Sequence, residues 1–253
     1  MALVSGARLV EFPGHLYAAW SDASRGDLRP AGDRPEDGVP LGTLATELAN
    51  ATDSRVDRVA WLSQVHGSQV RDVTSGTRTH DPPNPAVAWH LGEGDALVSL
   101  PSHVALCVLT ADCGALALSS PEGVFAAVHA GWRGLLDGVV EAVVDRMRRW
   151  GASDVVGALG PCIHAGCYEF SEPDLDAVAA VYGDAVRGRT SAGRPALDVP
   201  AGIDAALVRA GARSTVGVDV CTACGDGYFS HRARHDSGRQ ALLVWSGRGA
   251  DRR

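Results

Sequence analysis

The sequence predicts an α+β fold in which mixed β-sheets are covered by helices. Short apolar runs typical of buried strands alternate with amphipathic segments typical of helices along the chain. Several neighbouring apolar runs are separated only by tight turns, which antiparallel strands allow and a purely parallel sheet does not. The chain has no internal repeat, low-complexity tract or linker, so we expect a single domain over residues 1–253.

The first part of the chain is predicted to contain a helix between two polar loops. Residues 21–40 are rich in Gly, Pro and Asp and are expected to form a loop. The apolar spacing of residues 41–50 predicts a short helix, and residues 56–67 predict a strand that ends in a turn. A second polar, Pro-rich loop is expected over residues 74–95. Buried strands are then expected over residues 95–100 and 104–110.

Residues 110–134, TADCGALALSSPEGVFAAVHAGWRG, predict a hairpin with a thiol at one end and an imidazole at the other. If the turn is centred on Pro121, Cys113 lies directly opposite His129. Opposed residues have Cβ atoms roughly 4.5–5.5 Å apart. This distance suits two ligands of one metal ion, or a Cys–His dyad in which the imidazole activates a thiolate. A register shift of one residue would place the two side chains on opposite faces.

The second half of the chain alternates between predicted helices and strands. Residues 135–150 predict one amphipathic helix, whose C-terminal arginines suit the helix dipole. Residues 155–160 read as a buried strand. The remaining expected elements are helices near 174–183 and 201–212, a strand over 214–220, and a loop from 221 that leads to a final strand ending at 245.

Composition excludes several classes of function. The net charge of -7 argues against a nucleic-acid or anionic-membrane partner. No apolar run reaches the ~18 residues of a membrane span, and the N-terminus does not read as a secretory signal, so we expect a cytoplasmic protein. The chain has no lysine, which excludes Schiff-base chemistry and a Walker A site. Its six cysteines are then expected to be free thiols, metal ligands or a nucleophile, not disulfides.

Two further segments carry residues suited to a catalytic site. His66 ends a predicted strand beside a glycine turn, and with Cys113 and His129 it would complete a three-ligand metal site. Three protein ligands with an open fourth position are typical of catalytic zinc. The spacing alone does not bring His66 to the hairpin. In the loop HAGWRG, Gly131 permits close backbone approach, and Arg133 suits a phosphate or carboxylate or else is a solvated side chain.

Six segments together resemble the YfiH/laccase-domain family: QVHGSQV, GDALVS, TADC, AAVHAGWRG, LGPCI with CYEF, and CT with YFSHR. They lie within residues 57–245, whereas residues 1–56 diverge from the family. Members carry an early Thr-Arg-x-Gly-Gly segment, for whose arginine Arg25 is the candidate here. The resemblance implies a YfiH-like fold, shared with a toxin deamidase whose Cys–His pair matches Cys113 and His129. It also implies zinc (Zn2+) bound by His66, Cys113 and His129.

The resemblance further implies a metal-dependent enzyme that acts on purine nucleosides. Its expected reactions are phosphorolysis of adenosine, inosine and methylthioadenosine, and adenosine deamination. We expect a nucleoside and phosphate as partners, no nucleic acid, no membrane, and a monomer. In phosphorolysis, Arg133 and Arg232 would bind phosphate beside Gly131. In deamination, a metal-activated water would attack the purine ring while a carboxylate shuttles the proton. The candidate carboxylates are Asp112, Asp95 and Glu169.

Three other functions remain open at this point. The first is a copper (Cu2+) polyphenol oxidase, because thiolate and imidazole also suit copper. None of the nine histidines is two positions from another, which argues against a multicopper cluster built from His-x-His pairs. The second is a metal-free hydrolase with Cys113 as nucleophile, and the third is a peptidoglycan-precursor editing factor. CTAC (221–224) is a lone CxxC, and PCIHAGC has four residues between its cysteines, so no second zinc site is expected.

Overall fold

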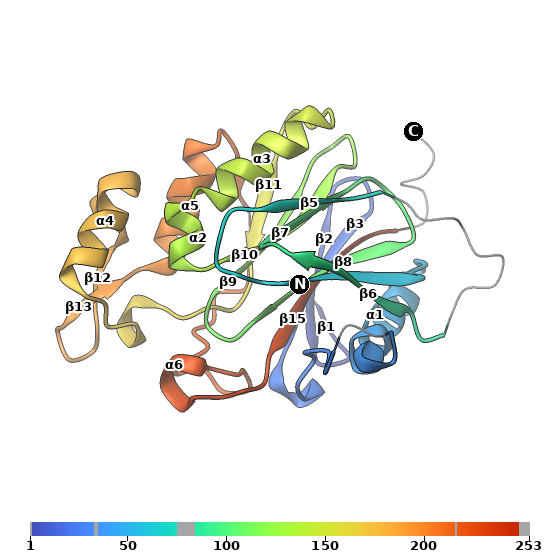
Figure 1. Ribbon diagram of the computed structural model, residues 1–253, viewed down its shortest axis with the longest axis horizontal. Helices are drawn as coiled ribbons and strands as arrows, with labels where there is room; N and C mark the ends of the chain where they lie inside the picture. Colours follow the sequence, from blue (N-terminus) through green and yellow to red (C-terminus); the bar gives the residue numbers. More distant parts are fainter. Residues whose placement is uncertain (1, 33–34, 75–83, 216, 248–253) are drawn as a thin grey trace.

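The computed structural model describes residues 2–32, 35–74, 84–215 and 217–247. Two large mixed sheets pack face to face, and helices cover both outer faces (Figure 1). The predicted α+β class, with mixed sheets and covering helices, is confirmed. Among the described residues, no helix is both long and apolar enough to cross a bilayer.

The first sheet joins the two ends of the chain. Strand β15 lies between β3 and β8, so the C-terminal strand connects the N-terminal meander to the rest of the sheet. Strand β4 runs parallel to both β6 and β8, whereas the other pairs are antiparallel. In spatial order the strands are β1 (Ala2–Val4), β2 (Ala7–Phe12), β3 (Leu16–Ser21), β15 (Gln240–Ser246), β8 (Val104–Thr110), β4 (Arg58–Ser63) and β6 (Val87–Glu93).

The second sheet contains the predicted hairpin at its centre. It is also mixed, because β5 runs parallel to β7 and β14 parallel to β11, while the inner pairs are antiparallel. In spatial order the strands are β14 (Arg213–Ser214), β11 (Val156–Leu159), β9 (Gly114–Ser119), β10 (Phe125–Ala130), β7 (Ala96–Ser99) and β5 (Val70–Val73). A separate small ribbon pairs β12 (Arg187–Arg189) with β13 (Pro195–Leu197).

Helices close the core on both sides. Helix α1 (Val39–Ala51) packs on the first sheet, and α2 (Trp132–Leu136), α3 (Val139–Arg149) and α5 (Val199–Arg209) pack on the second (Figure 1). Helix α4 (Glu172–Tyr182) lies further out and packs against α2, α5 and β13. A short helix, α6 (His231–Arg234), lies in the C-terminal loop. The single-turn 3-10 helices are η1 (Ala23–Arg25), η2 (Pro35–Gly38), η3 (Ala165–Cys167) and η4 (Asp184–Val186).

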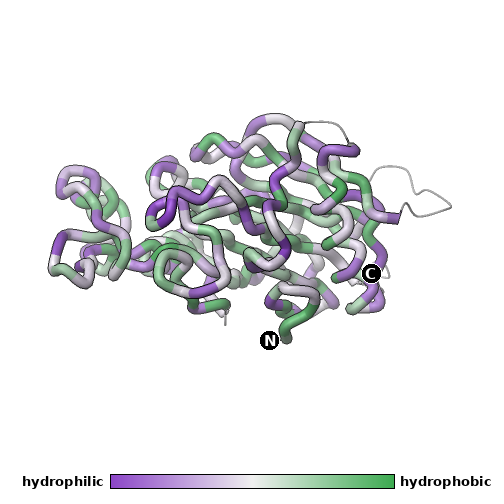
Figure 2. The backbone as a smooth tube through the Cα atoms, turned by 90° about the horizontal axis from the view of Figure 1, so that it is seen from below, coloured by the Kyte–Doolittle hydropathy of each residue, from purple (hydrophilic) through white to green (hydrophobic). Residues whose placement is uncertain are grey.

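The core has three layers because strand side chains alternate between faces. In β9, Leu116 and Leu118 pack against the helices, whereas Ala115 and Ala117 face the first sheet. Both faces of the second sheet are therefore buried, which explains why its strands read as continuous apolar runs. In Figure 2 hydrophobic residues recur along the central strands, whereas the outer turns are mostly hydrophilic.

Several expected elements differ from the observed ones. The single helix expected over 135–150 is two helices, because Gly138 adopts a left-handed backbone (φ 77°) that interrupts the helical path. The polar loop expected over 74–95 contains strand β6, whose sequence VAWHLGE follows a Pro-rich stretch. Residues 75–83 of this expected loop lie outside the described residues. The strand expected over 214–220 is wrong beyond its first residue, since the pairing of β14 with β11 stops at Ser214.

The hairpin forms, but its predicted register is wrong. Phe125 pairs with Ser119, and His129 pairs with Ala115 instead of Cys113. Cys113 precedes β9 by one residue, in the turn that follows β8. It is two positions before Ala115, so the alternation of side chains still brings it to the face of His129. The observed register differs from the predicted one by two residues. Side chains alternate between faces with a period of two, so Cys113 and His129 still share a face.

A close contact between the two sheets lies directly beneath this turn. The indole Nε1–H of Trp20 and the backbone N–H of Gly160 both donate to the Ala115 carbonyl oxygen, each at 2.9 Å. A Cβ atom on Gly160 would lie 2.0 Å from the Trp20 Nε1 atom. Residue 160 must therefore be glycine for the sheets to approach this closely.

We expect Gly160→Ala to lower the free energy of unfolding by about 2 kcal/mol, because the methyl group would displace a fully buried indole. Urea unfolding measures the change. Gly166→Ala is the matched control, since a Cβ there meets no atom within 4 Å. A loss for Gly160→Ala no larger than that of the control would contradict the close packing.

Candidate functional site

The three expected metal ligands lie together at one end of the two sheets. His66 follows β4, Cys113 lies in the turn between β8 and β9, and His129 belongs to β10. One donor atom from each lies within 4.8 Å of the others. The Cys113 Sγ atom is 3.9 Å from His66 Nε2, and the two imidazole rings meet edge to face at 4.8 Å between centroids. The fold thus supplies the proximity that sequence spacing could not.

A buried carboxylate, Asp95, orients two of these ligands. It accepts backbone N–H bonds from Val65 (3.3 Å), His66 (2.9 Å) and Gly67 (2.8 Å), and it contacts His129 Nδ1 at 2.8 Å. Asp95 is 0% exposed and His129 is 3% exposed. Since Nδ1 of His129 is occupied by this contact, Nε2 is the nitrogen left for a metal or a substrate.

Glycine allows the backbone to pass close to the ligands. A Cβ atom on Gly131 would lie 2.9 Å from His66 Cδ2 and 3.3 Å from Cys113 Sγ. A Cβ atom on Gly134 would lie 2.9 Å from the carbonyl oxygen of Gly67. The close approach expected for Gly131 is therefore confirmed, and HAGWRG packs directly against the turn that carries His66. His66 itself has a left-handed backbone, with φ 61°.

The protonation states of these groups are coupled. Burial alone would raise the pKa of Cys113, but His129 and His66 lower it to about 6. Burial alone would lower the pKa of His129, but Cys113 and Asp95 raise it to about 9. For Asp95, hydrogen bonds from His129 and the backbone outweigh burial and hold the carboxyl pKa below its usual value. Without a metal, the site therefore favours a thiolate and an imidazolium beside a carboxylate.

The donor set fits a tetrahedral metal ion. With Zn–S near 2.3 Å and Zn–N near 2.05 Å, tetrahedral geometry places nitrogen and sulfur about 3.6 Å apart. The 3.9 Å between Cys113 Sγ and His66 Nε2 is close to this value. The contact of His129 with Asp95 is the carboxylate–histidine pair that commonly supports a metal ligand. Thiolate and imidazole suit zinc and copper alike, so the donors do not select between the two metals.

Two cavities meet at His66 and Cys113. The smaller, of about 190 Å³, is lined by Asp112, Trp132, Arg133, Tyr168 and Arg232, among others. The larger, of about 550 Å³, is lined by Arg29, Trp61, Gln64, His129 and Arg239, among others. His66, Cys113 and His231 border both cavities. Together the cavities fall in the size range of small-molecule sites.

The two arginines expected to bind phosphate line the smaller cavity. The Arg133 guanidinium lies over the Trp132 ring at 4.5 Å, and that of Arg232 lies over the Tyr168 ring at 4.7 Å. Within the described part of the chain, neither guanidinium forms an ion pair with a carboxylate. Arg25, in contrast, pairs with Glu47 at 3.1 Å and lines neither cavity. The structure thus gives Arg25 no place at the site.

All three candidate proton-shuttle carboxylates are engaged in other contacts. The Asp112 oxygens accept bonds from the Thr222 hydroxyl and from the backbone N–H of Arg232, both at 2.6 Å. Asp95 holds the turn and imidazole described above. Glu169 is exposed and pairs with Arg194 at 2.6 Å. Asp112 borders the smaller cavity, but its contacts fix the position of the Arg232 segment; a catalytic role for it stays a prediction.

Sequence reasoning did not single out several residues that line the site. His231 and Tyr168 belong to the segments YFSHR and CYEF, yet neither has a periodicity that marks it as a cavity residue. Gln64, in QVHG, anchors the strand end: its side chain donates to Leu109 O and accepts from Leu109 N, both at 2.8 Å. Trp132, which also lines the smaller cavity, packs edge to face on Phe170.

Comparison with known proteins gives consistent matches. Residues 41–247 match the family described as multi-copper polyphenol oxidoreductase laccase. A purine nucleoside phosphorylase of Streptomyces coelicolor is 41% identical over 191 residues, covering 74% of this chain and 75% of the relative. Another, of Streptomyces griseus, is 35% identical over 228 residues and 89% of each chain.

Solved structures share the fold. The crystal structure of the hypothetical protein YfiH from Bacillus licheniformis matches with a TM-score of 0.75 and 20% identity over 97% of each chain. YlmD from Geobacillus stearothermophilus matches with a TM-score of 0.72 and 24% identity over 94% of this chain and 96% of that one. The expected YfiH-like fold is therefore confirmed.

We expect Asp95→Asn to weaken metal binding roughly 10- to 100-fold, because the amide loses the charge that supports His129 and cannot accept all four contacts as the carboxylate does. Competition with a chelator of known affinity measures the change. Asp72→Asn is the control, since Asp72 forms only a surface ion pair with Arg146. Equal metal affinity in the two variants would overturn the role assigned to Asp95.

In protein stripped of metal, alkylation of Cys113 should slow as pH falls through about 6, because the thiolate, which is the reactive form, is then protonated. An ordinary thiol would slow already near pH 8.5. Iodoacetamide labelling followed by peptide mass spectrometry measures the rate. Cys107 is the control: it is buried in β8, burial raises its pKa, and it should stay unlabelled. Added zinc should protect Cys113, and a midpoint near 8.5 would contradict the coupling with His129.

Proposed function

The chain belongs to the multi-copper polyphenol oxidoreductase laccase family, and from this premise we propose that it is a zinc-dependent purine nucleoside phosphorylase. The observation that carries the proposal is the meeting of two cavities at a two-histidine, one-cysteine site, with two arginines in the smaller cavity that pair with no carboxylate of the described residues. Relatives at 41% and 35% identity bear the name purine nucleoside phosphorylase, which supports it. The proposed substrates are adenosine, inosine and methylthioadenosine, each with phosphate.

Phosphate would occupy the smaller cavity. Guanidinium groups bind phosphate oxygens through paired, charge-assisted hydrogen bonds. Arg133 and Arg232 are each stacked on an aromatic ring, Trp132 and Tyr168 respectively, so fewer side-chain rotamers are lost when phosphate binds. The absence of a side chain at Gly131 keeps the path between this cavity and the ligands open.

The nucleoside would occupy the larger cavity, with its ribose toward the ligands. In phosphorolysis a phosphate oxygen forms a bond to C1′ of the ribose while the bond from C1′ to the purine nitrogen breaks. The electron pair leaves with the purine, which takes up a proton. Arg133 and Arg232 would orient the phosphate for attack, and His231, which borders both cavities, is placed to deliver the proton.

His66, Cys113 and His129 would hold the zinc ion at the junction of the cavities. When bound, the ion supplies Lewis-acid stabilisation of negative charge on substrate oxygen. Asp95 would keep His129 in the tautomer that presents Nε2 to the ion, and Gly131 would let the backbone pass beside the ligands. The metal-free hydrolase is less favoured, because it gives no role to the anchoring of His66 by Asp95 beside Cys113.

Adenosine deamination is the second reaction proposed for this site. It needs a group that carries a proton between water and the purine ring. Asp112, Asp95 and Glu169 are all engaged by other groups, and phosphorolysis makes no demand on them. We therefore place phosphorolysis first. Copper oxidase activity stays the alternative for the same three ligands.

We expect the protein to convert adenosine and phosphate into adenine and ribose 1-phosphate, and Cys113→Ala to lack this activity. Arg232→Gln should raise the KM for phosphate about tenfold or more, since a hydrogen bond to a charged group contributes about 1.5–3 kcal/mol. Arg213→Gln, which removes a surface ion pair with Asp154, is the control and should leave the KM unchanged. Chromatography of the products also reveals inosine if deamination occurs. A protein with zinc bound at His66, Cys113 and His129 and no turnover of any of the three nucleosides would refute the proposal.

A further inference from the structure

A second group of metal-binding side chains lies outside the site described above. Cys167, in η3, and Cys221 and Cys224, in the C-terminal loop, bring their sulfur atoms within 4.8 Å of one another. All three are free thiols. We propose that Cys167, Cys221 and Cys224 form a second, structural zinc site. The sequence pattern did not predict it, because the partner of CTAC is a single cysteine more than fifty positions away and not a second CxxC pair.

The three sulfur atoms are close enough for one metal ion. Two thiolates bound to one tetrahedral zinc ion lie about 3.8 Å apart, and all three sulfur atoms here lie within 4.8 Å of one another. A disulfide needs sulfur atoms about 2.05 Å apart and would leave the third thiol unused. Three thiolates also match the preference of soft sulfur ligands for zinc over magnesium or calcium.

The turn that carries Cys221 and Cys224 has the hydrogen bonding of a metal-binding loop. The backbone N–H of His164 donates to the Cys221 sulfur at 3.4 Å, and the N–H groups of Ala223 and Cys224 donate to the same atom. Such bonds stabilise a thiolate and orient its lone pairs. The turn closes with a bond from Gly225 N–H to Cys221 O at 2.7 Å. A Cβ atom on residue 225 would lie 2.5 Å from that oxygen, so the turn requires glycine there.

A positive charge supports the same turn. The Arg234 guanidinium donates to the carbonyl oxygens of Ala223 (2.9 Å), Thr222 (3.1 Å) and Tyr228 (2.5 Å). It therefore holds the loop in shape and offsets part of the negative charge that three thiolates would bring. Among the residues with described positions, no fourth His, Cys, Asp or Glu joins the group. Cys224 is exposed, so water would take the fourth position.

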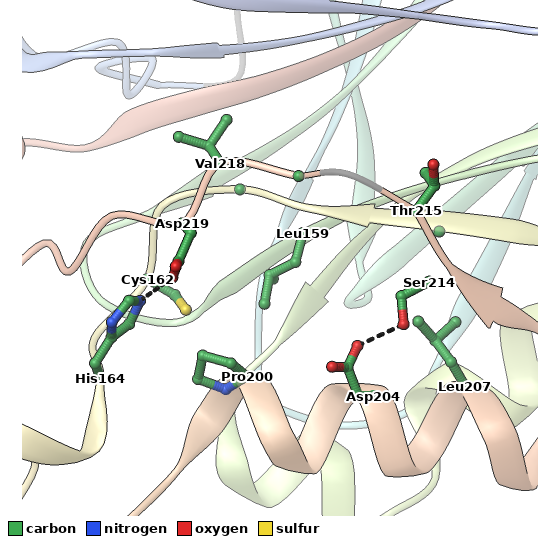
Figure 3. A pocket seen from close by; sticks show the side chains of 13 residues that line it. Leu159, Cys162, His164, Pro200, Asp204, Leu207, Ser214, Thr215, Val218 and Asp219 are labelled. Carbon is green, nitrogen blue, oxygen red and sulfur yellow. Dashed lines mark hydrogen bonds and ion pairs between the residues drawn. The ribbon is translucent and has the colours of Figure 1, made fainter. Parts of the chain in front are cut away.

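Neighbouring residues that look like further ligands are engaged elsewhere. Figure 3 shows His164 turned toward Asp219, with 3.7 Å between Nε2 and the carboxylate, at the edge of a separate cavity of about 260 Å³. Cys162 lines that cavity, and burial together with the Cys221 charge raises its thiol pKa well above the usual value. Cys162 is therefore a suitable control residue: it is adjacent to the cluster but not part of it.

The proposed ion would fix one wall of the substrate cavity. Cys167 precedes Tyr168, which lines the smaller cavity. Thr222, between the other two cysteines, donates to Asp112, and Asp112 accepts the backbone N–H of Arg232. A zinc ion joining Cys167 to the 221–224 turn would thus hold together the two segments that carry Tyr168 and Arg232. This role concerns the structure of the wall and does not depend on which reaction the site catalyses.

The test is metal content and cobalt spectroscopy on the full chain purified under reducing conditions. Elemental analysis should give two zinc ions per chain for the unmodified protein and for Cys162→Ala. Cys113→Ser should retain one, and the double variant Cys167→Ser/Cys224→Ser should also retain one. Cobalt(II) bound to Cys113→Ser should show thiolate-to-cobalt charge-transfer absorption, because the three thiols of the second site, Cys167, Cys221 and Cys224, are intact. This measurement decides the question even if the double variant fails to fold.

Three results would overturn the proposal. One is that the unmodified protein binds a single zinc ion and the Cys113→Ser variant binds none. Another is Cys113→Ser protein without thiolate-to-cobalt absorption. The third is a disulfide between two of the three cysteines that persists under reducing conditions, detected by mass spectrometry after alkylation. If the unmodified protein binds two zinc ions but does not phosphorolyse nucleosides, the result counts against the proposed function and not against the second zinc site.

Discussion

The buried carboxylate of Asp95 holds together the parts of the chain that form the site. It lies immediately before β7 and is fully enclosed, yet four donors from two separate segments satisfy it. A buried charge is tolerated only when it is paired and hydrogen-bonded in this way. The same contacts fix the left-handed turn at His66 and the orientation of the His129 ring, so the geometry of the ligand group follows from one electrostatic requirement.

The two sheets supply complementary parts of this arrangement. The first sheet delivers His66 at the end of β4, and the second delivers His129 within β10; Cys113 lies in the turn where the chain passes from one sheet to the other. The contact of Trp20 and Gly160 with Ala115 sets the separation of the sheets beneath that turn. Packing of the interior therefore determines the distances between the ligands, as expected for a site on rigid elements.

A second chain of contacts runs from this turn to the C-terminal loop. Asp112, next to Cys113, binds Thr222 and the backbone of Arg232, and Arg234 in the same short helix binds the carbonyls around Thr222. None of the α6 residues is buried, so polar contacts position this helix in place of hydrophobic burial. A metal ion on Cys167, Cys221 and Cys224 would add a further constraint on the loop that carries it.

The sequence by itself determined the elements whose signals are local. Apolar runs such as 104–110 form buried strands, and the periodic stretch 41–50 lies in α1. The residue types of QVHG, TADC and VHAGWRG predicted a metal-binding group, and the three side chains lie together. Only the tertiary structure decided what depends on contacts between distant segments. The hairpin register is set by strand pairing, the helix break is set by the left-handed backbone that Gly138 adopts, and the meeting of Cys167 with the 221–224 turn is set by the folding of two loops. The reason is physical: propensity and periodicity act over a few residues, whereas side-chain proximity across a sheet or between loops is set by the packing of the whole core.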